Sequence, residues 1–77
     1  MPRLTTIKWK TLECIFLKDG FHFERQVGDH RSYSKKGILR PVVIPTYNTI
    51  DIDIIKSNMR TAGLTRERYF ELLKKCR

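Results

Sequence analysis

The sequence predicts an α+β fold in which helices pack on one face of a small antiparallel sheet. Apolar residues near both ends of the chain recur at helical spacing, whereas those between residues 21 and 44 alternate as they do in strands. The chain has 77 residues, enough for one modest core but not for a deep substrate cavity. We therefore expect residues 1–77 to form a single domain whose chemistry lies on the surface.

The first element is predicted to be a helix from about residue 7 to residue 18. Three apolar residues share one side of it: Leu12, Ile15 and Phe16. Thr5 or Thr6 can cap its start. Gly20 ends it, at a position that often takes a left-handed conformation.

Residues 21–27 change to a period of two and are predicted to form a strand. Its mostly apolar face consists of alternate residues: Phe21, Phe23, Arg25 and Val27. His22 falls on the other, solvent-facing side. Gly28 and Asp29 form a turn pair, so a second strand is expected at residues 30–34.

A third strand is expected at residues 39–44, after a hairpin connection at residues 35–37. Pro41 has no backbone N–H to donate, so this strand lies at an edge of the sheet or begins late. Pro45 is expected to close it.

The clearest amphipathic pattern predicts a second helix after Asp51, which can serve as its N-cap. Its apolar stripe consists of Ile52, Ile55, Met59 and Ala62. Gly63 ends this helix, and Thr65 caps a short last one. The apolar face of that last helix consists of Tyr69, Leu72 and Leu73.

The composition is strongly basic, with 16 Lys and Arg against 8 Asp and Glu, a net charge of +8 and a pI near 9.9. A pI this high favours a nucleic-acid partner. Release of counterions from phosphates supplies much of the affinity of such proteins. Basic surfaces also keep small proteins soluble, so charge alone leaves both readings open.

The two cysteines, Cys14 and Cys76, do not form a Cys-x-x-Cys pair, so neither a zinc ribbon nor a thioredoxin motif is present. A single bridge between them stays possible, but we expect Cys14 to be a small core residue and Cys76 a free thiol. The N-terminus lacks an apolar signal core, and no apolar run is long enough for a membrane span. We expect a soluble protein of the reducing cytoplasm, with no membrane contact and no metal or other cofactor.

His30 is the candidate catalytic residue, because an imidazole exchanges protons near neutral pH and here stands among basic residues. RNA cleavage by transesterification needs a base for the ribose 2′-hydroxyl and cations for the charge that grows on phosphorus. The alternative is that His30 is a solvated turn residue. The candidate RNA-binding residues surround it in sequence: Arg25, Arg31, Tyr33, Lys35 and Lys36. Tyr33 can stack on a base or belong to the core, and both readings stay open.

The order of residues along nearly the whole chain resembles the HicA family, the ribonuclease toxins of toxin–antitoxin pairs. The matching residues are Gly20-Phe21, Arg25, Gly28-Asp29-His30, Tyr33, Pro45, Arg60-Thr61-Ala62-Gly63-Leu64-Thr65, Glu67 and Leu72-Leu73. The resemblance implies a fold like a double-stranded-RNA-binding domain. It also implies metal-independent cleavage of mRNA with His30 as the essential histidine, and a HicB-type antitoxin that covers it.

Two positions depart from the family pattern. Many members have a small hydroxyl residue or glycine where Asp29 stands, and a carboxylate there would repel the scissile phosphate. Many also carry a histidine shortly after Pro45, where this chain has Thr46 and Tyr47. The general acid is left open among Tyr33, Lys35 and water.

Three functions compete on the sequence. The first is an endoribonuclease toxin that acts alone or in a small complex with its antitoxin. The second is an RNA-binding module without catalysis. The third is a regulatory partner whose basic face holds an acidic antitoxin.

Overall fold

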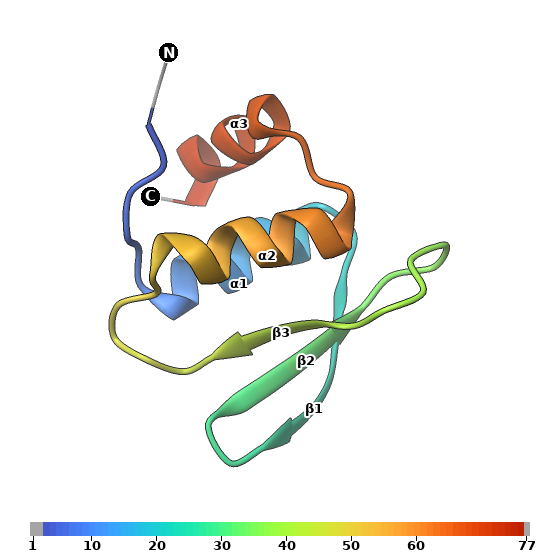
Figure 1. The fold of residues 1–77 in the computed structure, drawn as a ribbon. Coiled ribbons are helices and arrows are strands. Elements are labelled where there is room, and N and C mark those ends of the chain that lie inside the picture. Colours follow the sequence, from blue (N-terminus) through green and yellow to red (C-terminus); the bar gives the residue numbers. More distant parts are fainter. Residues whose placement is uncertain (1–2, 77) are drawn as a thin grey trace.

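The computed structural model describes residues 3–76 and contains three helices and three strands in the predicted order (Figure 1). They are α1 (Trp9–Lys18), β1 (His22–Val27), β2 (His30–Ser34), β3 (Val42–Pro45), α2 (Ile52–Ala62) and α3 (Arg66–Cys76). This αβββαα order confirms the predicted α+β class and the likeness to a double-stranded-RNA-binding domain. The last helix is not short, because α3 has 11 residues, as α2 has.

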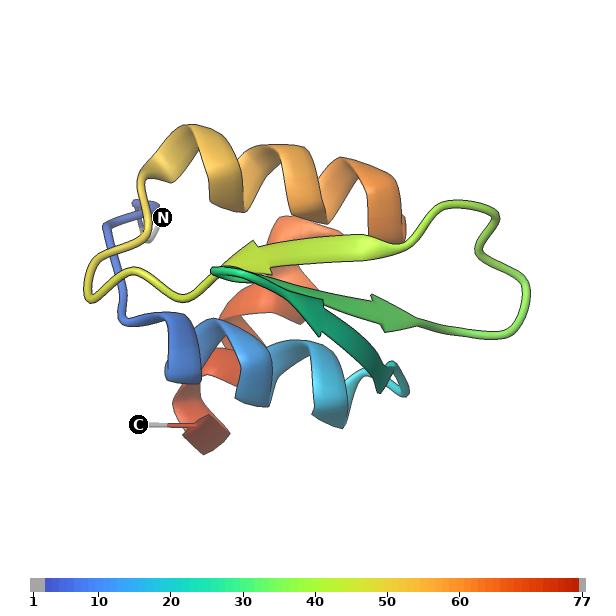
Figure 2. The same ribbon diagram turned by 90° about the horizontal axis from the view of Figure 1, so that it is seen from below.

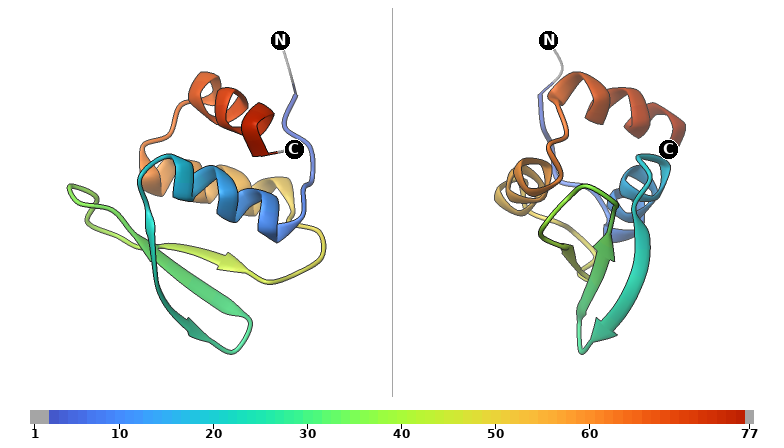
Figure 3. Two further views of the ribbon diagram at one scale, coloured as in Figure 1. Left: turned by 180° about the vertical axis from the view of Figure 1, so that it is seen from behind. Right: turned by 90° about the vertical axis from the view of Figure 1, so that its right-hand side faces the viewer.

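The elements stack in three layers, with the sheet, then α1 and α2, then α3 (Figures 1 and 3). The sheet is antiparallel in the order β1-β2-β3. Seen from the sheet side, α1 and α2 lie along opposite flanks of the strands (Figure 2). Both helices therefore cover the same face of the sheet, and the opposite face, here called the open face, is left for solvent.

The core lies between the sheet and the helices, where the predicted helical stripes are buried except for Ile52, which is only half-buried. Its members from α1 are Leu12, Ile15 and Phe16, and those from α2 are Ile55, Met59 and Ala62. The second layer of helix packing is built by Tyr69, Leu72 and Leu73 of α3. Full burial of one such side chain stabilises the fold by about 1.5–3 kcal/mol.

The helix ends agree with the sequence at α2, at α3 and at the end of α1, which stops at Lys18 before the positive-φ Gly20, but not at the start of α1. Gly63 is left-handed with φ of 66°, and Thr65 Oγ1 accepts a hydrogen bond from Arg68 N at 3.1 Å. Asp51 occupies the N-cap position, yet its side chain makes no capping hydrogen bond. The predicted threonine cap of α1 is wrong, because the helix begins at Trp9. Residue 7 is held outside it by a β-bridge to Ile50.

The third strand lies at an edge of the sheet and begins late, at Val42, as the position of Pro41 indicated, and it includes Pro45 instead of ending before it. Pro41 precedes the first paired residue, as a residue without an N–H donor should. The connection between β2 and β3 is consequently longer than residues 35–37, and it projects from the sheet (Figure 1). Leu39 in this loop is fully exposed.

A bulge in β1 overturns the predicted alternation of that strand. The pairing shifts between Phe23, opposite Tyr33, and Arg25, opposite Ser32. An extra residue in one strand transfers the residues beyond it to the other face. Phe23 therefore lies on the helix side with Tyr33, whereas Arg25 and Val27 lie on the open face, and every residue of β1 is exposed.

The cysteines form a disulfide, so the prediction of Cys76 as a free thiol is wrong. The Cα atoms of Cys14 and Cys76 are 5.9 Å apart although 62 positions separate the residues. The bridge forms because α3 folds back over α1 and brings the end of the chain to the middle of the first helix (Figure 3). Cys14 is half-buried at this contact rather than inside the core.

Candidate active site

His30 is the first residue of β2, directly after the tight turn at Gly28 and Asp29. Gly28 has a φ of 57°, in the left-handed region that glycine tolerates best. The turn is held by hydrogen bonds from Gln26 Nε2 to the Gly28 carbonyl at 2.9 Å and from Thr46 N to the Asp29 carbonyl at 2.7 Å. His30 pairs with Pro45 across the sheet and is exposed.

The imidazole borders a groove of about 460 Å³ between β3 and α2. Three side chains able to bind an anion or a ring lie around it: His30, Arg40 and Tyr47. The rest of the lining is Pro41, Val43 and Pro45 from the sheet side, with Ile54, Ser57, Asn58 and Thr61 from α2. The groove arises because α2 runs beside the edge strand, so the helix forms one wall and the open face forms the other.

The electrostatics of this groove favour a negatively charged ligand. Its lining contains one imidazole and one guanidinium and no carboxylate. Arg40 is exposed and forms no ion pair within residues 3–76. Asp29, the carboxylate next to His30 in sequence, makes no ion pair with it. A nucleic-acid strand lying along the groove would meet a proton-transfer group at one end and an unpaired cation towards the other, because His30 pairs with Pro45, five positions after Arg40.

Two of the predicted RNA-binding residues are exposed and available. Arg25 lies on the open face with His30, opposite Ser32 on β2. Lys36 is exposed in the loop that follows β2. In the described part of the chain neither side chain has an acidic partner. Both can therefore contact phosphates without first breaking an internal ion pair.

Arg31 is turned to the other face of the sheet and is held there. Its guanidinium carbon lies 4.1 Å from the ring centre of Phe23 and 5.5 Å from that of Trp9. Arg31 Nη2 is 3.1 Å from Glu13 Oε2, and its Nε donates to the Tyr33 hydroxyl at 2.9 Å. The bond to Tyr33 raises the pKa of Arg31. These contacts give Arg31 a structural role and engage its guanidinium group within the protein.

Tyr33 is fully buried, which settles its two readings in favour of the core. Its hydroxyl donates to the Glu13 carboxylate, and its ring meets Phe23 edge-on with centres 5.8 Å apart. Burial raises the pKa of Tyr33 to about 12, with the hydrogen bond to Glu13 as the second cause. A ring in this position cannot stack on a base, so Tyr33 leaves the set of RNA contacts.

Lys35 is likewise engaged within the protein. Its Nζ lies 3.3 Å from Asp19 Oδ2, and Arg68 of α3 approaches the other oxygen of the same carboxylate at 3.6 Å. Asp19 thus joins the end of β2 to α3. Lys35 stabilises the fold and carries less free charge for RNA than the sequence suggested.

A comparison with known protein families shows the family of the chain. A model described as the HicA toxin of bacterial toxin–antitoxin systems matches residues 9–64, nearly three quarters of the 77 residues. The chain belongs to the HicA toxin family. The match runs from the start of α1 to just past α2 and leaves α3 outside it. No curated protein and no solved structure was found to be significantly similar.

Sequence reasoning missed three residues of the HicA groove. Arg40 is one of several basic residues that follow His30 in the chain, and Tyr47 follows the third strand, but no local pattern links either residue to the histidine. Asn58 carried a usable signal, because it interrupts the apolar face of α2 one residue before Met59. A polar residue within a buried face is more informative than an apolar residue at the surface.

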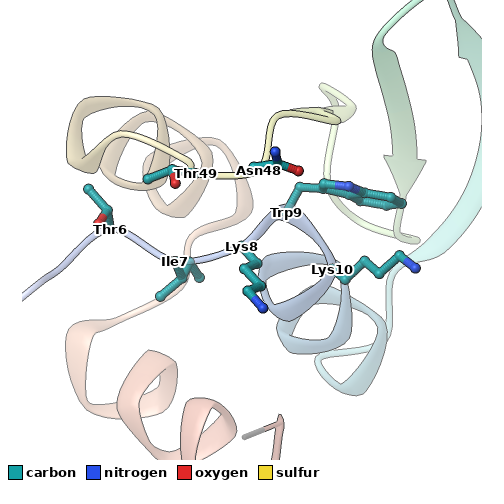
Figure 4. Close-up of a pocket in the computed structure, with 7 residues that line it drawn as sticks. All are labelled: Thr6, Ile7, Lys8, Trp9, Lys10, Asn48 and Thr49. Atoms are coloured by element: carbon teal, nitrogen blue, oxygen red, sulfur yellow. The ribbon is translucent and has the colours of Figure 1, made fainter.

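A second hollow, of about 550 Å³, lies at the start of α1 and is lined by Thr6, Ile7, Lys8, Trp9, Lys10, Asn48 and Thr49 (Figure 4). The indole of Trp9 and the side chain of Lys10 extend in the same direction, with Lys10 Nζ 5.8 Å from the ring centre (Figure 4). The same indole contacts Arg31. The hollow does not include His30, so we do not place chemistry in it.

Within residues 3–76, no three His, Cys, Asp or Glu side chains gather as a metal site would require. None of the helices there combines the length and the apolarity that crossing a bilayer demands.

Proposed function

We propose that this HicA chain is an endoribonuclease toxin that cleaves mRNA without a metal ion, with His30 as the catalytic acid/base, which serves as the base in the cleavage step. The observation that supports this most is the position of His30, exposed at the mouth of a groove that it shares with an unpaired arginine and no acid. The whole of residues 1–77 is taken as one toxin domain, with α3 completing the core.

In the proposed reaction, neutral His30 removes the proton of a ribose 2′-hydroxyl. The freed oxygen attacks the adjacent phosphorus, and the bond from phosphorus to the 5′-oxygen breaks. The products are a 2′,3′-cyclic phosphate and a 5′-hydroxyl, whose proton comes from water, because Tyr33 is buried and Lys35 is paired with Asp19. Protonated His30 then gives its proton to the hydroxide left by that water and is neutral again. DNA lacks the attacking hydroxyl, so the mechanism restricts the substrate to RNA.

The cations divide into two groups in this proposal. Arg40 lines the same groove as His30, near the start of β3, and binds a phosphate of the RNA strand that enters the groove. Arg25 and Lys36 bind phosphates on either side of the cleaved bond and give the binding its dependence on salt. Arg31 and Lys35, which pair with Glu13 and Asp19, maintain the sheet and its contact with the helices.

The antitoxin belongs to the same proposal. An acidic HicB-type protein in the cytoplasm would cover His30 and neutralise part of the net charge of +8. Val27 and Val43 are 66% and 37% exposed on the open face near His30, and they offer apolar contact area to such a partner. Release from the complex under stress would then expose the groove to mRNA.

The test is incubation of the purified protein with a labelled transcript in the presence of a chelator. We expect wild type to cleave and His30→Ala to be slower by about 10²- to 10⁴-fold, the usual contribution of general acid–base catalysis. His22→Ala is the matched control, because His22 is also exposed and lies at the far end of the same hairpin. Equal cleavage by wild type and His30→Ala would reject the catalytic role. Binding without cleavage by wild type would favour the non-catalytic RNA-binding module.

A further inference from the structure

Asn58 is an exception in the core of this protein. It is the one polar residue buried within residues 3–76, with 7% of its surface exposed. Its side-chain Nδ2 has no hydrogen-bond partner in that part of the chain. A buried donor without an acceptor costs about 1–3 kcal/mol, and such groups in native proteins call for an explanation. An apolar residue at this position of α2 would avoid the cost.

The location of Asn58 supplies the explanation. The residue lines the groove that contains His30, between Ser57 and Thr61 of the same helix. The hydroxyl of Thr61 already donates to the Ser57 carbonyl at 3.1 Å, so it is engaged within the helix. The terminal torsion of an asparagine side chain is soft, and rotation about it can present the amide to a molecule in the groove. Asn58 thus keeps an unused donor in the wall of the candidate active site.

Tyr47 provides the second half of a binding site. Its ring is 49% exposed and borders the same groove. An exposed aromatic ring stacks on the face of a base, and an amide donor pairs with an acceptor on its edge. Together these are the two contacts by which proteins hold an unpaired nucleobase.

We propose that the groove between β3 and α2 is a nucleobase subsite, in which Tyr47 stacks on the base and the Asn58 amide donates to its edge. The role of this subsite in the reaction depends on the proposed function. The subsite would hold the nucleotide beside the phosphate that is cleaved at His30. A base can offer both its face and its edge only when it is unpaired. The substrate is therefore single-stranded RNA rather than a duplex.

The test measures binding, so that it does not depend on cleavage. The probe is a short mixed-sequence RNA with 2′-O-methyl groups, which cannot be cleaved by the proposed route, used alone and annealed to its complement. Fluorescence anisotropy at one salt concentration should show single-stranded probe bound at least about tenfold more tightly than duplex. Asn58→Leu and Tyr47→Ala should each weaken single-strand binding by about tenfold. Asn48→Leu, at the only other asparagine, should not.

Thermal unfolding separates binding from folding. Replacement of an unsatisfied buried amide by leucine should leave the melting temperature of Asn58→Leu unchanged or higher. Weaker binding by a variant that is at least as stable supports the subsite. If Asn58→Leu is less stable, Tyr47→Ala decides, because its exposed ring contributes little to the core.

The proposal is overturned by any of three results: unchanged binding in both variants, duplex bound as tightly as the single strand, or no binding of either probe by wild type. Cleavage of a transcript that is insensitive to Asn58→Leu would leave His30 chemistry standing and remove the subsite. Binding that depends on Asn58, without any cleavage, would support the subsite and reject the chemistry at His30.

Discussion

Reduction of the Cys14–Cys76 disulfide should destabilise the protein by about 4 kcal/mol. The bridge joins residues 62 positions apart and so restricts nearly the whole unfolded chain. In the chain-entropy relation, a loop of this length loses about 14 cal/mol/K of unfolded-state entropy, which is about 4 kcal/mol at 25 °C. A chain of 77 residues has a total stability of about 4–12 kcal/mol. The disulfide is therefore a major part of what keeps this domain folded.

The assay is guanidinium unfolding with and without a thiol reductant, followed by the fluorescence of Trp9, the single tryptophan. Trp9 packs partly against the core and contacts Arg31, so its emission should change when α1 leaves the sheet. With a denaturant dependence of about 2 kcal/mol per molar, typical of a small domain in guanidinium, the midpoint should fall by about 2 M on reduction.

Cys76→Ser is the control for this experiment. Its midpoint should equal that of reduced wild type and should not respond to the reductant. The buried residues Leu72 and Leu73 still hold α3 to α1, so both reduced forms should remain folded in the absence of denaturant. If oxidised and reduced wild type unfold at the same midpoint, the loop-closure reasoning is refuted.

Three further outcomes are expected. Tyr33→Phe should lose about 1.5–3 kcal/mol at neutral pH, because Glu13 loses a charge-assisted hydrogen bond. The pKa of Tyr33 is raised to about 12 in the folded state, so its contribution is present below pH 10 and lost as pH rises towards 12. The stability gap between wild type and Tyr33→Phe should narrow over this range in alkaline unfolding curves. Gly63→Ala should cost about 1–2 kcal/mol, seen as a lower melting temperature, because φ at this position is 66°. Lys36→Ala should lower RNA affinity and the salt dependence of binding without changing the melting temperature. Arg31→Ala should instead lower the melting temperature, because Arg31 pairs with Glu13. A stable Arg31→Ala that binds RNA weakly, or an unstable Lys36→Ala, would contradict these roles.

The order of the helices and strands could be read from short-range patterns. Helical spacing of apolar residues predicted the buried stripes of α1 and α2, and a period of two predicted strands near residues 22 and 30. Gly63 and the Thr65 cap were placed correctly, because a left-handed residue and a capping hydroxyl act within one helical turn. His30 was singled out by composition alone, from its basic and polar neighbours in the chain.

The faces and partners of the side chains depended on pairings that no local pattern contains. One bulge transferred Arg25 to the open face and left Phe23 to stack with Arg31. Register across the sheet and the packing of α2 beside its edge placed His30, Arg40 and Asn58, from separate parts of the chain, around one groove. Propensity and periodicity act over a few residues, whereas strand register, ion pairing and the joining of chain ends minimise the free energy of the whole packed domain. For this reason the helices and strands of this toxin could be predicted from its sequence, whereas the residues that line its groove could not.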